Sequence, residues 1–245
     1  MFSQLRIFRY ISIVSLTFIL AYSTGFAAQQ SRLPKRIVAN YVVSKDGTPF
    51  AKVSEIYLVT GNTYKVESTT KGIGIYALLG QRKLTSTGLV TAQGLKPQHF
   101  ELHQGHSESK TLLSDFDWSN NTLTMLVKGT PQVVPLAAGT QDLASFAYQF
   151  MFISKSLKND ITVTLTTGKK LNQYQYKIQP ELEVMNVDGT QYKTMHLVPA
   201  IRSSEHTETK ELWLLRDKNF ILGRFLMVDE DGAKLEQTLT EFHFD

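Results

Sequence analysis

Hydrophobic and polar residues alternate along most of the chain, in short runs separated by turn residues. The run 161–166 places an apolar side chain at every second position, which is typical of a half-buried strand, and runs such as 37–43 and 51–59 are short β-type runs bounded by turns. Pairs such as Asp46-Gly47 and Asp188-Gly189 lie between successive runs and favour hairpins. The pattern predicts an antiparallel meander of about 14 strands.

One stretch, residues 139–158, has the pattern of a helix instead. Its apolar residues fall close to one helical stripe: Leu143, Phe146, Ala147, Phe150 and Leu157. Thr140 is expected to cap the first turn, in which Asp142 also lies. The aromatic residues between 146 and 152 also alternate at period two, so a strand is the alternative. We favour the helix because about 18 residues is long for a strand.

An antiparallel sheet of this size is expected to curl, because strands twist and a long open sheet does not stay flat. The predicted fold is therefore mainly β, with a large curved antiparallel sheet or half-barrel and one central α-helix near residues 140–158. We expect the helix on the concave face of the sheet. Two packed sheets with the helix as a linker are the alternative. Residues 28–245 are expected to form a single β-rich domain.

The first 27 residues have the pattern of a cleaved export signal. Arg6 and Arg9 precede an apolar run at 11–21, and a small-x-small cleavage site follows at 25–27. The run is short for a membrane span, although an uncleaved anchor is the alternative. With no cysteine after the run, attachment through a lipidated cysteine is excluded. We expect a periplasmic protein.

The amino-acid composition excludes disulfide bonds and argues against one class of partner. The chain contains no cysteine, so it must fold without disulfides. The net charge is +4, and loss of Arg6 and Arg9 with the signal leaves 24 basic against 22 acidic residues, a net charge of +2. So small an excess of basic residues argues against a nucleic-acid partner.

A glycine-framed apolar run, residues 72–80, has no clear periodicity. It is either a buried connection or short core helix, or an apolar lip over a ligand cavity. If a cavity for a lipid-like ligand exists, its candidate lining residues come from this run, the central helix and a later strand: Ile73, Ile75, Tyr76, Leu79, Phe146, Phe150 and Trp213.

Several segments, in their order along the chain, carry a resemblance: Ser86–Pro97, Phe116–Trp118, Gly139–Ser145, Glu211–Lys218 and Met227–Gly232. Together they make the chain resemble the bacterial exported proteins built on domain of unknown function 3108. The likeness spans nearly all of residues 28–245. One departure is Leu222-Gly-Arg224, where a proline is expected before the arginine. The resemblance implies an exported, mainly β protein with no established activity, and it supplies no catalytic residues.

Histidines at 99, 103 and 106 are the one cluster with the composition of a metal site. In a strand, His99, Glu101 and His103 share one face, which is also how an ordinary solvated strand face is composed. Because a zinc site needs three or four converging ligands, we predict a solvated face and no metal or cofactor. A metal site that includes His106 is the alternative.

Three functions are compatible with these patterns. The first is a non-catalytic periplasmic protein that binds a lipid-like or other hydrophobic ligand. The second is an envelope protein that acts by contacting another protein and holds no ligand. The third is a metal-dependent enzyme that uses the cluster from His99 to His106. We favour the first because apolar residues concentrate at 73–79 and 143–153, beside a sheet large enough to curl.

Overall fold

The computed structural model describes residues 33–105, 111–153, 160–200 and 208–245. Within these ranges, Leu33–Asp245 form one compact unit. The predicted export signal at 1–27, His106 and the last part of the predicted helix lie outside the described residues.

Sixteen strands in the described ranges form one sheet, which is antiparallel except for the pairing of β9 with β10. Their bounds are β1 (Arg36–Lys45), β2 (Thr48–Thr60), β3 (Thr63–Gly72), β4 (Gln81–Thr91), β5 (Gly94–Gln104), β6 (Leu112–Asp117), β7 (Thr122–Val127), β8 (Thr130–Pro135), β9 (Gln141–Asp142), β10 (Asp160–Thr166), β11 (Leu171–Ile178), β12 (Glu183–Val187), β13 (Thr190–Pro199), β14 (Thr209–Leu215), β15 (Ile221–Val228) and β16 (Lys234–Phe244). The described helices are η1, a 3-10 helix (Gly74–Leu79), and α1 (Phe146–Ile153).

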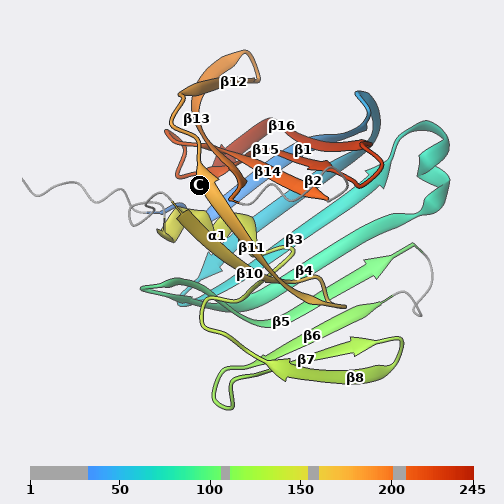
Figure 1. Cartoon of the computed structure of the whole chain (residues 1–245), viewed down its shortest axis with the longest axis vertical. Coiled ribbons are helices and arrows are strands. Elements are labelled where there is room, and N and C mark those ends of the chain that lie inside the picture. The colour runs from blue at the N-terminus through green and yellow to red at the C-terminus, as the bar shows by residue number, and fades with distance from the viewer. Residues whose placement is uncertain (1–32, 106–110, 154–159, 201–207) are drawn as a thin grey trace, which may run out of the picture. The chain divides into compact units, whose positions relative to one another are not determined.

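The sheet is a meander with one long-range seam. Strands β8 to β1 pair in reverse order, and β1 then pairs with β16, from which the sheet continues to β9 (Figure 1). Tyr41 lies opposite Leu239 at this seam, and Arg36 closes it with an ion pair to Asp245 at 2.6 Å. The first and last described strands are therefore neighbours, and the sequence pattern does not predict this pairing.

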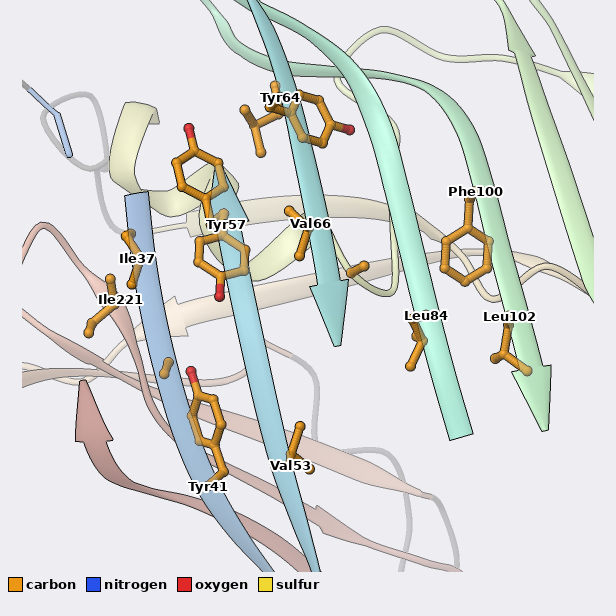
Figure 2. Close-up of a cluster of buried hydrophobic side chains, with 14 of the residues drawn as sticks. Ile37, Tyr41, Val53, Tyr57, Tyr64, Val66, Leu84, Phe100, Leu102 and Ile221 are labelled. Carbon is orange, nitrogen blue, oxygen red and sulfur yellow. The ribbon is translucent and has the colours of Figure 1, made fainter. Parts of the chain in front are cut away.

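Alternation determines which face of β1 to β5 is buried. Most of the inward-facing residues of these strands join one apolar cluster, ten of whose side chains are labelled in Figure 2. Tyr57, Val66 and Phe100 are no more than 1% exposed within it. The intervening residues on these strands are half-buried or exposed, as the period of two predicts.

Helix α1 lies between the two groups of strands, β1 to β8 on one side and β10 to β16 on the other. Tyr148 and Met151 belong to the cluster formed mainly by the first group. Ala147 and Phe150 belong to a second cluster with residues of β10, β11 and β13 to β15. The helix is apolar on both sides because it is buried on both sides. The predicted helix between two β-rich parts is confirmed for the residues that the structure describes.

The predicted start of the helix and its predicted cap are wrong. Helix α1 begins at Phe146, because Gln141 and Asp142 pair with Leu165 and Thr166 as the short strand β9. The Thr140 hydroxyl donates to the Ala137 carbonyl at 2.7 Å and caps nothing. The strand alternative for residues 146–152 is also wrong, since these residues are helical.

Two further segments differ from expectation. Residues 130–135 contain Pro131 and Pro135, which argue against a strand, but they form edge strand β8, where a missing N–H is tolerated. Residues 74–79 form η1, which contains no buried residue, so the predicted buried connection or core helix is wrong. Within the described ranges, no helix is long and apolar enough to cross a membrane.

Candidate functional site: a cavity beside the central helix

A cavity of about 300 Å³ lies between the inner face of β1 to β4, the start of α1, and strands β10, β11 and β14 to β16. Most of its lining is apolar and comes from distant parts of the chain: Val43, Val53, Leu84, Leu143, Ala144, Phe146, Ala147, Val163, Leu165, Leu222, Phe225, Met227 and Leu235. The sheet therefore encloses a hydrophobic space that no single segment forms.

The cavity is placed at one end of the sheet by strand register. Val43 is near the end of β1, and Thr70 near the end of β3, whereas Arg82 is near the start of β4. Thr70 pairs directly with Arg82, and the chain between them forms η1. The cavity and η1 consequently lie at the same end of these strands.

Glu55 is an acidic residue on the inner face of β2, in the row that also holds Val53 and Tyr57. Its carboxylate accepts hydrogen bonds from the Ser68 hydroxyl at 3.0 Å and the Tyr148 hydroxyl at 3.1 Å. Burial raises the pKa of Glu55, and these two hydrogen bonds oppose the rise. Tyr148 also stacks on Tyr57, with ring centroids 5.0 Å apart. Through these hydrogen bonds, Glu55 on β2 links α1 to β3.

Arg82 is a cationic residue that also faces the cavity, in the inner row of β4 with Leu84 and Ser86. It forms no ion pair with any residue in the described parts of the chain. Burial lowers the pKa of its guanidinium, which still carries its charge at neutral pH. A partly buried guanidinium that no described carboxylate pairs with is suited to bind an anionic group.

The second cation of the cavity, Lys210 on β14, is already engaged. Its ammonium lies over the Tyr174 ring, 4.8 Å from the centroid, and donates to the Tyr174 hydroxyl at 3.3 Å. It also pairs with Glu208. Arg82 is therefore the better candidate for contact with a ligand.

A buried hydrogen-bonded chain fixes the N-terminal end of α1 next to the cavity. Asp142, fully buried, accepts from the Ala144 and Ser145 backbone N–H groups, both at 2.9 Å. Its other oxygen accepts from the Ser86 hydroxyl at 2.6 Å, and Ser86 is hydrogen-bonded to Tyr64 at 2.9 Å. Because α1 begins at Phe146, these two N–H groups belong to the turn just before the helix, and Asp142 holds that turn in place.

Gln149 joins the other side of the helix to the β4–β5 turn. Its amide oxygen accepts from the Leu95 N–H at 2.7 Å, and its amide nitrogen donates to the Gln93 carbonyl at 3.0 Å. The turn comes so close that a Cβ on Gly94 would lie 2.3 Å from the Gln149 amide oxygen. Glycine is required at 94 for this approach and for its positive φ of 111°.

The seven predicted ligand-binding residues do not line one common cavity. Phe146 lines the cavity, whereas Phe150 is buried in the second apolar cluster. Ile73, Ile75, Tyr76 and Leu79 all lie in or beside η1 and are exposed. Trp213 does not line the cavity: it stacks on His196 and donates to Glu183 at 2.6 Å.

The two described histidines of the predicted cluster, His99 and His103, contact different acidic residues. The His99 Nδ1 atom lies 2.7 Å from Asp115, and the His103 Nε2 atom lies 2.6 Å from Glu101. His103 also contacts Thr111 at 2.9 Å. Among the described residues, no group of three or more potential ligands is arranged to hold a metal ion. His106 is outside these residues, so the metal hypothesis stays a prediction.

Sequence reasoning missed Glu55 and Arg82, although the alternation contained a signal for both. In the rows Val53, Glu55, Tyr57 and Arg82, Leu84, Ser86, a charged residue occupies a position that faces the core. A charge at a buried position of a strand needs a specific partner, which makes it a candidate site residue.

Comparison with known proteins identifies a family and a fold. The family model described as "Protein of unknown function (DUF3108)" matches residues 40–240. No match was found among proteins with curated functions. A β-barrel-like protein of domain of unknown function DUF1849 from Brucella abortus is similar in structure, with a TM-score of 0.53 and 13% identity, over 87% of this chain and 99% of that one. A DUF1329 family protein from Desulfovibrio piger matches at a TM-score of 0.22 and 11% identity, over 86% of each chain.

Proposed function

The chain belongs to the DUF3108 family of proteins of unknown function, and we propose that it is a non-catalytic periplasmic protein that binds an amphipathic ligand. The ligand would have one apolar chain and an acidic head group. The observation that carries this proposal is the cavity, which is lined mainly by apolar side chains from both groups of strands. The export pattern of residues 1–27 supports the periplasmic location.

Cavity size limits the ligand. Ligand pockets commonly measure about 300 to 1,000 Å³, so this cavity is at the small end of the range. A single-chain amphiphile fits such a space better than a lipid with several chains. An apolar chain would contact residues such as Leu84, Phe146 and Val163.

The acidic head group is inferred from Arg82. Its guanidinium can form two parallel hydrogen bonds with a carboxylate, and each is stronger at a partly buried site than in water. Glu55 does not compete for Arg82, because its carboxylate accepts from Ser68 and Tyr148. Since Glu55 is committed to these contacts, it is also not placed to act as a free acid or base.

A titration with a fluorescent single-chain fatty acid and its neutral alcohol tests the proposal. We expect one saturable site per chain, with the acid bound more tightly than the alcohol. Replacing Arg82 by methionine should weaken acid binding by about 10- to 100-fold, because a charged hydrogen bond is lost, and should leave alcohol binding nearly unchanged.

Lys193→Met is the matched control, since Lys193 is exposed and lies on β13, a strand that contributes no residue to the cavity lining. Its affinity for both probes should equal that of the unchanged protein. Absence of saturable binding of either probe would contradict the proposed function. Equal loss of acid and alcohol binding in Arg82→Met would contradict the role of Arg82 in binding the head group.

A further inference from the structure

The most exposed apolar side chains among the described residues belong to η1. Leu78 is 85% exposed, Ile75 77% and Leu79 72%, although each is a large hydrophobic residue. Tyr76 and Ile73 are exposed at 45% and 38%. Scattered exposed apolar residues are common, but five within seven positions form a contiguous patch of the kind that marks an interaction site.

This apolar tip, residues 73–79, is held in a fixed position. The Ile73 N–H donates to the Phe50 carbonyl at 2.7 Å, and the Tyr76 ring packs edge-on against Phe50, with centroids 5.6 Å apart. Gly72 allows the chain to turn tightly, because a Cβ there would lie 2.2 Å from the Tyr76 carbonyl oxygen. The tip is therefore presented by the sheet as a formed surface.

Two lysines beside the tip have the same charge and face each other. Lys52 on β2 is directly opposite Lys71 on β3, and both are exposed. Neither forms an ion pair with a described residue, in contrast to Lys65 and Lys83, which share Glu67. Like charges opposite each other on a strand pair are unfavourable, so an anionic partner would relieve this repulsion.

The acidic residues at this end of the sheet lie at the β1–β16 seam or beyond it, and Asp46 in the β1–β2 turn accepts from the Lys234 N–H at 2.8 Å. Asp229, Glu230 and Asp231 form the β15–β16 turn. In the strand order, the β1–β16 seam separates this turn from the tip. An anionic surface would therefore meet the tip and the Lys52–Lys71 pair while the acidic turn stays on the other side of the seam.

We infer that the tip at residues 73–79, flanked by Lys52 and Lys71, docks on the surface of a membrane that contains anionic lipids. Leu78, Ile75 and Leu79 enter the interface between head groups and acyl chains, and the two lysines contact the lipid phosphates. The cavity lies at the same end, with its lining residues Thr70 and Arg82 on either side of the tip in the sequence. Docking itself does not depend on a ligand in that cavity.

Flotation of residues 28–245 with vesicles tests the inference. We expect binding to vesicles of phosphatidylcholine with phosphatidylglycerol, and much weaker binding to phosphatidylcholine alone or at high salt. The double variant Ile75→Glu with Leu78→Glu should bind at least about 100-fold more weakly, because two apolar side chains no longer enter the interface. Lys52→Gln with Lys71→Gln should bind about 30-fold more weakly.

The control is Val133→Glu with Val184→Glu, which changes two residues that are 62% and 54% exposed on β8 and β12. Its binding should be unchanged, and circular dichroism should show that all variants are folded. Failure of the unchanged protein to bind anionic vesicles would overturn the inference, as would normal binding by the Ile75 and Leu78 variant. A dimer that this variant converts to monomers, without vesicle binding, would assign the tip to self-association instead. Ligand titration of the same proteins reports separately on the cavity.

Discussion

Replacing Asp142 by alanine should lower the free energy of unfolding by about 4 kcal/mol at neutral pH. The change removes the acceptor of three buried hydrogen bonds, from the Ala144 and Ser145 N–H groups and the Ser86 hydroxyl. Each buried donor without a partner costs about 1 to 3 kcal/mol. Urea denaturation followed by circular dichroism measures the loss.

Asparagine at the same position is the matched control for shape. Its amide oxygen can accept from the same two backbone N–H groups, and its amide nitrogen can donate to Ser86. The Ser86 hydroxyl would then donate to Tyr64, a reversal that their 2.9 Å contact permits. Asp142→Asn should therefore be much less destabilising than Asp142→Ala. Equal losses in the two variants would contradict the stabilising role of these hydrogen bonds.

The pH dependence of stability tests the charge of the same group. Burial raises the pKa of Asp142 to about 6, although hydrogen bonds from Ser86, Ser145 and Ala144 oppose the rise. Between about pH 4 and pH 6 the folded protein binds more protons at Asp142 than the unfolded chain does, so stability falls as the pH rises. From pH 7 to pH 4, the unchanged protein should gain about 2 to 3 kcal/mol relative to Asp142→Asn. A constant difference would contradict the raised pKa.

Filling the cavity from the helix should abolish ligand binding. Ala147 lies on α1 and lines the cavity, so a phenylalanine ring at this position would occupy space assigned to the ligand. We expect Ala147→Phe to bind the fatty-acid probe at least about 30-fold more weakly. Overpacking costs about 1 to 3 kcal/mol, so the fraction folded must be measured in the same sample.

Two further variants separate cavity filling from local damage to the helix. Val163→Trp enters the same cavity from β10 and should also weaken probe binding. Ala92→Phe adds the same ring as Ala147→Phe in the exposed β4–β5 turn and should leave binding unchanged. If the two cavity variants are folded and bind the probe normally, the ligand site is not this cavity.

The sequence pattern predicted a strand well where apolar and polar residues alternate within that strand. β1, β2 and β10 lie within a few residues of the runs that predicted them, because one face of each is buried. β8 was missed because Pro131 and Pro135 argue against a strand, although an edge position accepts them. Pattern within a segment cannot show which segments pair, so the β1–β16 seam was not predicted.

The start of the helix illustrates how tertiary contacts override local preference. Thr140 and Asp142 are residue types that suit the start of a helix, which favoured a helix that begins near residue 140. Pairing of β9 with β10 and the hydrogen bond from Ser86 hold Asp142 in a strand, so the helix begins only at Phe146. Trp213 was chosen as a candidate site residue for its aromatic side chain, but tertiary contacts place it outside the cavity. Its ring stacks on polar neighbours, His196 and Arg224.

Native mass spectrometry of the protein purified from its own host, without detergent, tests the central claim most directly. We predict a population with one bound molecule per chain, released as an acidic single-chain amphiphile on collisional activation. Ala147→Phe prepared in the same way should have the mass of the bare chain, while Ala92→Phe should retain the molecule. If the unchanged protein and both variants all have the mass of the bare chain, the cavity does not bind such a ligand and the account is wrong.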